Sequence, residues 1–297
     1  MKFADTRNNA VPTYCVSTDT LLEVSKSFDQ NVKEWIQKTQ FLGSIGQSVL
    51  CPTKNGQMIA FLGMGNKKSR KRTRFQLAAA AKSLPPGSYE ILNPEAVENF
   101  EIETLGWLMN SYIFDKYKNK KDTQAYLVEP KTINSKRILQ IAEAEAFARD
   151  LINTPTSDMG PENLALAAKS LANKFNAHYS EIVGEELIEK NFPLIHSVGR
   201  ASSQEPRLLT IKRGNKGPKI TLVGKGVCFD TGGLNIKPGR SMGLMKKDMG
   251  GAANVLALAS MILSANMDVQ LTVLIPAVEN SISGNSFRPG DILKARN

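Results

Sequence analysis

The alternation of apolar strand-like runs with helical segments after residue 138 is the feature that most limits how this chain can fold. RLLTIKRG (207–214), KITLVGKGV (219–227) and VQLTVLIPAVEN (269–280) read as strands, and DMGGAANVLALASMILSA (248–265) has the apolar spacing of a helix. Apolar strands of this kind must be shielded from solvent, and the helices that connect them can pack on the faces of the sheet. The pattern predicts an α/β fold with a mixed, mostly parallel sheet that helices cover on both faces.

Two further helices are expected before these strands. Apolar residues recur at helical spacing in RILQIAEAEAFARDLIN (137–153), and the Pro155 that follows should end that helix. Pro161 then opens PENLALAAKSLANKF (161–175), because proline is well tolerated in a first helical turn. His196, within FPLIHSVG (192–199), is expected at a strand end or in a loop.

The first 131 residues predict a separate, smaller α/β domain. QSVLCPTKNGQMIAFLGMG (47–65) reads as a strand, an Asn-Gly turn and a second strand, and TRFQLAAAAKSL (73–84) reads as a helix that Pro85 ends. GWLMNSYIFDKYKNK (106–120) resembles an amphipathic helix, and AYLVEP (125–130) a short strand. We therefore place the domains at residues 1–131 and 132–297.

Composition excludes several classes of protein. The N-terminus has no secretory pattern and no run of eighteen apolar residues occurs, so we expect a cytoplasmic chain that does not contact a membrane. Three cysteines without metal-type spacing fit free thiols, and two histidines leave little material for a histidine-rich zinc site or a Ser-His-Asp triad.

A basic run accounts for much of the formal net charge of +10. GNKKSRKRTRF carries six lysines and arginines between residues 67 and 74. Such a run can bind a polyanion, but it is also typical of a solvated loop and first helical turn. Because no nucleic-acid motif accompanies the run, we do not expect nucleic acid to be a partner.

The chemistry of the chain concentrates where an apolar strand gives way to a glycine-rich loop. VGKGVCFDTGG (223–233) carries Lys225 and Asp230, with Lys237 and Asp248 following. Ligand sites of α/β sheets lie at such strand ends. A buried lysine is stabilised by losing its proton, which leaves an amine able to bind a metal, or by a neighbouring carboxylate. Two carboxylates and two lysines in this span suggest a site that combines metal ions with electrophilic groups.

Simpler interpretations remain open on spacing alone. Lys225 and Asp230 fit a buried salt bridge as well as a pair of metal ligands, and Asp248 fits the N-cap of the following helix. VGKG lacks the GxxxxGK[ST] frame of a phosphate-binding loop. FDTGG is similar to the Asp-Thr-Gly of aspartic proteases, but those enzymes need a second aspartate and this helix-rich chain has one copy.

Four motifs, in the same order, resemble the leucyl aminopeptidase (cytosol aminopeptidase) family of two-metal exopeptidases. The run VGKGVCFDTGGLNIKPGRSMGLMKKDMGGAANVL (223–256) closely resembles the family's signature. ARDLINTPTSDMGPENLA (148–165), LIHSVGRASSQEPRLLTIKRG (194–214) and PAVENSISGNSFRPGDIL (276–293) resemble its neighbouring segments. The resemblance covers roughly residues 138–297, and the first domain resembles a shortened version of the family's variable N-terminal domain.

The resemblance implies a role for each residue of the signature. Lys225 and Asp248 would bind the tighter metal, and Asp230 would bridge two divalent ions, Mn or Zn, that activate water for attack on the first peptide bond. Lys237 would be the catalytic lysine, which binds substrate by stabilising the oxyanion. Met245 would line the pocket for the first side chain and favour leucine-like residues, although it also fits a core methionine.

The chain departs from the family's pattern at its end. That pattern continues into an Asn-Thr-Asp-Ala-Glu-Gly-Arg segment, which these 297 residues do not reach. The resemblance implies that this segment supplies further carboxylates for both metals and an arginine that holds bicarbonate. We therefore expect one metal ion or none in this chain, and we do not expect the family's homo-hexamer to carry over to it.

Two interpretations of function follow. In the first, the chain is a truncated piece of an aminopeptidase that acts on peptides. In the second, it is a catalytically inactive product or a binding module, which could use residues 67–74 for a polyanion. We expect the purified chain to release no leucine from a leucyl amide with manganese or zinc.

Overall fold

The computed structural model describes residues 1–5, 9–71, 73–118, 124–284 and 286–293. It divides into two compact units, Met1–Glu143 and Ala144–Asn297, and the division falls inside the helix α6 (Ser135–Asn153). The boundary expected between residues 131 and 132 lies shortly before this helix and stays a prediction.

The first unit is built on a five-stranded mixed sheet with the order β2-β3-β1-β4-β5. β1 pairs in parallel with β3 and β4, β4 in parallel with β5, and β2 antiparallel with β3. The strands are β1 (Val11–Val16), β2 (Ser48–Pro52), β3 (Met58–Gly63), β4 (Gly87–Ile91) and β5 (Ala125–Leu127). The helices are α1 (Leu21–Lys26), α2 (Gln30–Lys38), α3 (Lys67–Arg70), α4 (Gln76–Ala81), η1 (Pro94–Ala96) and α5 (Phe100–Asn110).

The sequence predicted the hairpin of β2 and β3, the helix α4 and the strand β5, but it did not predict β1, β4, α1 or α2. The helix expected over residues 106–120 was wrong in its bounds, because α5 begins at Phe100 and ends at Asn110. Asn99 caps its start by accepting a hydrogen bond from the backbone N–H of Ile102. At its end, the Ser111 hydroxyl donates to the Leu108 carbonyl at 2.6 Å, a local bond that competes with continuation of the helix. Residues 119 and 120 of that expected helix lie outside the described residues.

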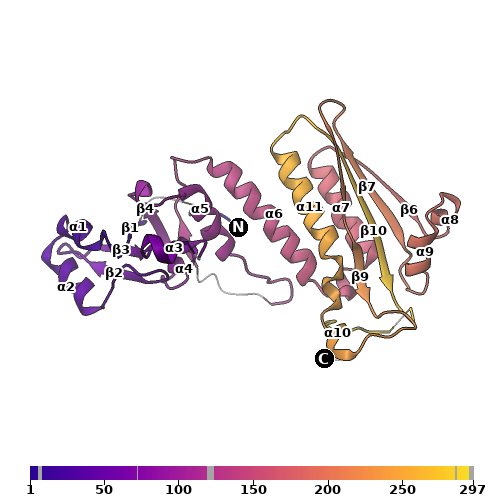
Figure 1. Cartoon of the computed structure of the whole chain (residues 1–297), viewed down its shortest axis with the longest axis horizontal. Coiled ribbons are helices and arrows are strands. Elements are labelled where there is room, and N and C mark those ends of the chain that lie inside the picture. The colour runs from indigo at the N-terminus through magenta and orange to yellow at the C-terminus, as the bar shows by residue number, and fades with distance from the viewer. Residues whose placement is uncertain (6–8, 72, 119–123, 285, 294–297) are drawn as a thin grey trace. The chain divides into compact units, whose positions relative to one another are not determined.

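The second unit contains a mixed sheet with the order β6-β7-β10-β8, and β9 also pairs with β10. Its strands are β6 (His178–Val183), β7 (Arg207–Arg213), β8 (Lys219–Val223), β9 (Gly226–Asp230) and β10 (Gln270–Asn280). Its further helices are η2 (Thr156–Asp158), α7 (Pro161–Lys174), α8 (Glu186–Glu189), α9 (Pro193–Gly199), α10 (Gly239–Met242), η3 (Met245–Met249) and α11 (Gly250–Ser264). Figure 1 shows α7 and α11 running along this sheet.

The mixed α/β architecture expected from the sequence is confirmed. Parallel pairing does not predominate in the second sheet, because β10 pairs in parallel with β8 and β9 while β7 pairs antiparallel with both β6 and β10. His196 lies in the helix α9, so the expectation of a strand end or loop was wrong. Pro193 explains this, because its fixed φ favours a first helical turn.

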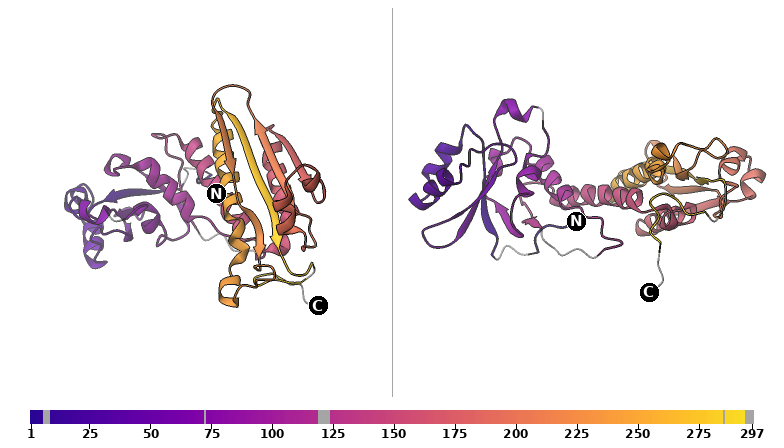
Figure 2. Two further views of the ribbon diagram at one scale, coloured as in Figure 1. Left: turned by 45° about the vertical axis from the view of Figure 1, so that its right-hand side comes forward. Right: turned by 90° about the horizontal axis from the view of Figure 1, so that it is seen from below.

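One face of the second sheet carries the main core of the unit. Alternate residues of β10, from Leu271 to Ala277, are buried against α7, α11 and the second half of α6. The opposite side chains of β10 are only half-buried. The long helices α7 and α11 therefore pack on one face of the sheet, as the left view of Figure 2 shows, and the short helix α9 packs against β10 and β7.

Candidate functional site

A close approach between the end of β8 and the start of α11 sets the geometry of Lys225. The backbone N–H of Ala252 donates to the carbonyl of Lys225 at 2.8 Å. A Cβ added at Gly224 would lie 2.8 Å from the Ala252 Cα, and one added at Gly251 would lie 2.9 Å from the Lys225 nitrogen. Only glycine leaves room for this approach, so the VGKG and GGAA runs together hold Lys225 beside the first turn of α11.

Lys225 and Asp248 form the first ion pair of the site. The Lys225 Nζ lies 2.5 Å from Asp248 Oδ2. Asp248 belongs to η3, and the residue that caps α11 is Met249, which makes no side-chain capping bond. The interpretation of Asp248 as the cap of this helix was therefore wrong, because η3 carries its carboxylate to Lys225 instead.

Lys225 is not buried, contrary to the sequence-based expectation. Its side chain is 56% exposed, whereas that of Asp248 is 18% exposed. The reason is that β8 lies at an end of the described sheet order, and its last residue, Val223, is itself exposed. The pair therefore has one solvated and one half-buried member.

A tight turn after β9 forms the second ion pair, between Asp230 and Lys237. The backbone N–H of Lys237 donates to the Thr231 carbonyl at 2.9 Å, which closes the loop and returns the lysine to the strand end. Gly232 and Gly233 have φ values of +88° and +63°, which glycine adopts without strain. As a result the Lys237 Nζ lies 3.0 Å from Asp230 Oδ2.

The other oxygen of Asp230 is also fully engaged. Its Oδ1 accepts hydrogen bonds from the Gly232 backbone N–H at 2.9 Å and from Asn280 Nδ2 at 2.8 Å. Partial burial by itself would raise the pKa of this carboxyl, but the bonds from Lys237, Gly232 and Asn280 outweigh it and hold the pKa below the ordinary value. Asp230 is therefore an ionised carboxylate at neutral pH.

The strand β9 links the two pairs. Lys225 directly precedes its first residue, Asp230 is its last residue, and η3 packs against the strand. Lys225 pairs with Asp248 rather than with Asp230, so the salt bridge considered from the sequence is not formed. Met245 begins η3, is half-buried and lies three residues before Asp248, and its substrate-binding role stays a prediction.

The donors of this region fit a divalent metal in kind. Asp230 and Asp248 offer carboxylate oxygens and Lys225 offers an amine once it has lost its proton, and Mn and Zn both accept oxygen and nitrogen ligands. Among the described residues no group of three His, Cys, Asp or Glu side chains could hold a metal ion. The fit therefore depends on the lysine acting as a ligand.

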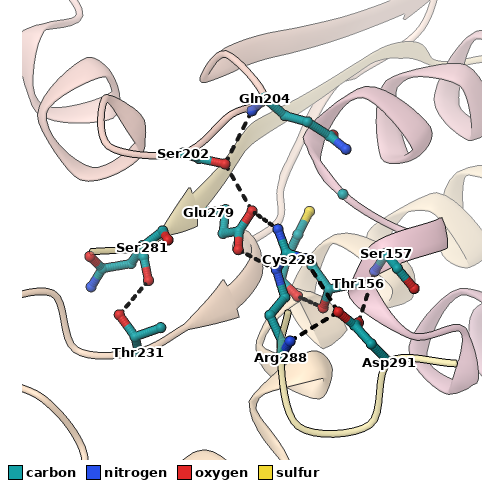
Figure 3. Close-up of polar contacts among 12 residues, drawn as sticks. Thr156, Ser157, Ser202, Gln204, Cys228, Thr231, Glu279, Ser281, Arg288 and Asp291 are labelled. Atoms are coloured by element: carbon teal, nitrogen blue, oxygen red, sulfur yellow. Dashed lines mark hydrogen bonds and ion pairs between the residues drawn. The ribbon is translucent and has the colours of Figure 1, made fainter. Parts of the chain in front are cut away.

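A buried network, which the sequence did not predict as part of the site, supports β10 beside Asp230. Arg288 binds the Glu279 carboxylate through Nε at 2.5 Å and through Nη2 at 2.9 Å, and Ser202 Oγ donates to Glu279 Oε2 at 2.8 Å. Asp291 accepts from the backbone N–H groups of Ser157 and Arg288. Figure 3 shows Glu279 between Ser202 and Arg288, and Asp291 reaching Ser157.

The network holds the residue that positions Asp230. Glu279 is 2% exposed and directly precedes Asn280, whose carbonyl accepts from both the backbone N–H and the hydroxyl of Thr231. The only signal for it in the sequence was the motif PAVENSISGNSFRPGDIL, which contains Glu279, Asn280, Arg288 and Asp291.

Known families match both units of the chain. Residues 146–297 match the cytosol aminopeptidase family, catalytic domain, and residues 11–130 match the M17 aminopeptidase, N-terminal domain. A probable cytosol aminopeptidase of Aquifex aeolicus is 33% identical over 93% of this chain and 60% of its own length. A probable cytosol aminopeptidase of Wolinella succinogenes is 31% identical over 92% of this chain and 61% of its own length.

Solved structures agree with these matches. The crystal structure of the cytosol aminopeptidase from Coxiella burnetii has a TM-score of 0.86 and 38% identity, covering 97% of this chain and 62% of that protein. The bottromycin maturation enzyme BotP in complex with Mn has a TM-score of 0.77 and 25% identity, covering 95% of this chain and 62% of that protein. The chain spans about 60% of the length of the curated relatives that it matches. These findings confirm the resemblance inferred from the four sequence motifs: the chain belongs to the cytosol aminopeptidase family.

Proposed function

We propose that the two Lys–Asp pairs around β9 are part of the centre of a metal-dependent aminopeptidase, which removes leucine-like residues from the N-termini of peptides. The observation that carries the proposal is that four charged residues gather around β9. Lys225 directly precedes this strand and Asp230 ends it, while Lys237 from the following loop and Asp248 from η3 pair with them. Family membership supports the reaction class, and the geometry supports the assignment of the residues.

One of the proposed metal ligands, Asp230, is already held in place. Lys225 and Asp248 would hold one divalent ion, Mn or Zn, and Asp230 would be a ligand of both that ion and a second one. Bound metal would supply a Lewis acid and an activated water. Because Asp230 is fixed by Gly232 and Asn280, its carboxylate needs little reorganisation to accept an ion. The family resemblance associates bicarbonate with an arginine of the further segment and not with these four side chains.

Lys237 has the properties of a fixed cation. The Thr231–Lys237 backbone bond and the contact with Asp230 hold its ammonium group at the strand end, where it could stabilise the oxyanion that forms at the substrate carbonyl. Met245 would contact the first side chain of the peptide, because η3 places it three residues before Asp248. An apolar contact there would favour leucine.

The alternative function is polyanion binding by an inactive product. Lys67, Lys68 and Lys71 are exposed around α3, which leaves them accessible to a phosphate-rich partner, while Arg72 lies outside the described residues. Binding to heparin that disappears when these three lysines are replaced by glutamine would favour this alternative.

The relatives' name places them in the cytosol, and we propose the same compartment for this protein. No helix among the described residues is both long and apolar enough to cross a membrane.

The proposed function can be tested with a chimera. Residues 1–297 would be joined to the part of the Coxiella burnetii aminopeptidase that the structural match leaves uncovered. We expect this chimera to release leucine from leucine p-nitroanilide in a manganese- or zinc-dependent reaction, and Lys237→Ala to lower kcat by about 100-fold or more. A folded chimera without activity would contradict the proposed function. Turnover by the 297-residue chain alone would instead refute the expectation that the further segment is required.

A further inference from the structure

We propose that a cavity in the first unit binds a small organic anion with an apolar body, independently of the metal site. The cavity has a volume of about 540 Å³, within the range of roughly 300–1,000 Å³ that is typical of small-molecule sites. Its lining residues all lie between Met64 and Leu105, on α3, the turn before α4, η1 and α5.

Two arginines supply positive charge to this cavity. Arg70 donates through Nη1 to the Gly65 carbonyl at 3.2 Å, but its buried Nε makes no hydrogen bond within the described structure. The nearest acid to that nitrogen is the exposed Glu98, at 3.9 Å, which is too long for a hydrogen bond. Arg74 is exposed at the same cavity. A carboxylate or phosphate in this cavity would pair with the positive charge of the Arg70 and Arg74 guanidinium groups.

Two acids line the cavity, the exposed Glu98 and the buried Glu103, and the buried one already bonds to the backbone. Glu103 is 6% exposed and accepts a hydrogen bond from the backbone N–H of Leu77 at 2.8 Å. Burial raises the pKa of this carboxyl, and bonds from the backbone of residues 75–77 partly offset the effect. Glu103 therefore holds the start of α4 and does not pair with either arginine in any described contact.

That turn also keeps Phe75 in an unusual conformation. Phe75 has φ +61° and ψ +52°, a left-handed conformation that is costly for a residue with a bulky side chain. Its ring packs against α5 at Gly106, where an added Cβ would lie 2.5 Å from the ring. Strained residues that the surrounding structure over-determines concentrate at ligand sites. Here the strain places an aromatic ring in the wall of the cavity.

The lining defines the class of ligand. Phe75, Val97 and Ile102 provide apolar surface, and Arg70 and Arg74 provide the recognition of an anion. The matching ligand is a carboxylate or phosphate that carries a short aliphatic or aromatic group. The anionic group could belong to a free metabolite or to a nucleic-acid phosphate, and the two sources differ in whether the apolar group is needed.

The test is a calorimetric titration of the 297-residue chain with phenyl phosphate. We expect saturable binding that benzyl alcohol and benzylamine do not reproduce, because the first lacks the charge and the second reverses it. Arg74→Gln should weaken binding by about tenfold or more, since a charge-assisted bond is lost. Lys68→Gln and Lys71→Gln remove the same charge from exposed residues outside the cavity lining and should leave binding unchanged.

Arg70→Gln should have an effect as large as that of Arg74→Gln, but it also removes the bond to Gly65. Arg74→Gln therefore decides the question if the Arg70 variant does not fold. The proposal is overturned if phenyl phosphate does not bind, or if all four variants weaken binding equally. It is also overturned if a short single-stranded oligonucleotide binds while phenyl phosphate and phenylacetate do not.

Discussion

Replacing each of the two site lysines in turn should have opposite effects on manganese binding. Lys225→Met removes a proposed ligand, so we expect Mn²⁺ to bind at least about tenfold more weakly. Lys237→Met removes a cation 3.0 Å from Asp230 Oδ2 and leaves that oxygen free for the metal. Methionine keeps much of the length of lysine in both cases, which limits changes in packing.

The magnitude for Lys237 follows from the exposure of its pair. Two unit charges at about 3 Å interact by roughly 1.4 kcal/mol in bulk water and more at lower dielectric. The side chains of Lys237 and Asp230 are 31% and 18% exposed, so solvent still screens the pair, and we take its contribution as on the order of 1 kcal/mol. Mn²⁺ must overcome that attraction, and Lys237→Met should therefore tighten binding by about fivefold.

The assay is the electron paramagnetic resonance signal of free Mn²⁺, titrated against each variant at neutral pH. Lys216→Met serves as the matched control, because it makes the same change in charge at an exposed residue outside the site. Thermal unfolding of each variant would show that it is folded. Weaker binding in Lys237→Met with no change in Lys225→Met would refute the assignment of ligand and non-ligand lysine.

Three further predictions concern the framework of the site. Gly251→Ala should lower the free energy of unfolding by about 1–3 kcal/mol, because the new Cβ would lie 2.9 Å from the Lys225 nitrogen. Gly250→Ala, where the nearest atom is 3.8 Å away, is the matched control in the same thermal melts, and equal losses would contradict the close approach. Arg288→Gln should cost about 3 kcal/mol in denaturant unfolding, since it leaves Glu279 buried with its main cation removed, and Arg288→Leu with Glu279→Leu should recover part of this. The pKa of Asp230 is lower in the folded than in the unfolded state. Asp230 therefore stabilises the fold at pH values above its ordinary pKa, and this stability is lost as the pH falls through the pKa of the folded state. Asp230→Asn should therefore flatten the acid side of the stability curve, and an unchanged curve would show that Asp230 makes no such contribution.

The sequence predicted the place of the site residues along the fold better than their surroundings. The apolar runs and helical spacing identified β8, β10 and α11, and the glycine-rich loop located Lys225 and Asp230 at a strand end. The burial of Lys225 was predicted wrongly because hydrophobic pattern shows that a segment is a strand, but does not show where that strand stands in the order of the sheet. β8 lies at the end of the described order, and the lysine that follows it is solvated.

The supporting network was beyond prediction for a related reason. Glu279 and Arg288 are nine residues apart, with a turn-rich segment between them, and no periodic pattern relates a strand to the loop that follows it. The pairing of Glu279 with Arg288 can be recognised only in the folded chain, which brings Ser202 and Ser157 from two distant segments to the same place. Such a buried network depends on tertiary geometry, because every member must find its partner.

The two lysines show most clearly what tertiary structure adds. Both follow apolar segments, both stand near glycines, and their side chains are chemically identical, so spacing alone gave no basis for different roles. In the folded chain the two lysines differ in the carboxylate that each one contacts. Lys225 is held at the start of α11 and meets the carboxylate of Asp248, whereas Lys237 is returned by the Thr231 turn to Asp230. Asp230 has two additional hydrogen-bond donors, Gly232 and Asn280, that hold its carboxylate in place without Lys237. Loss of Lys237 should therefore leave a preorganised carboxylate, whereas loss of Lys225 removes a donor that no other described contact replaces.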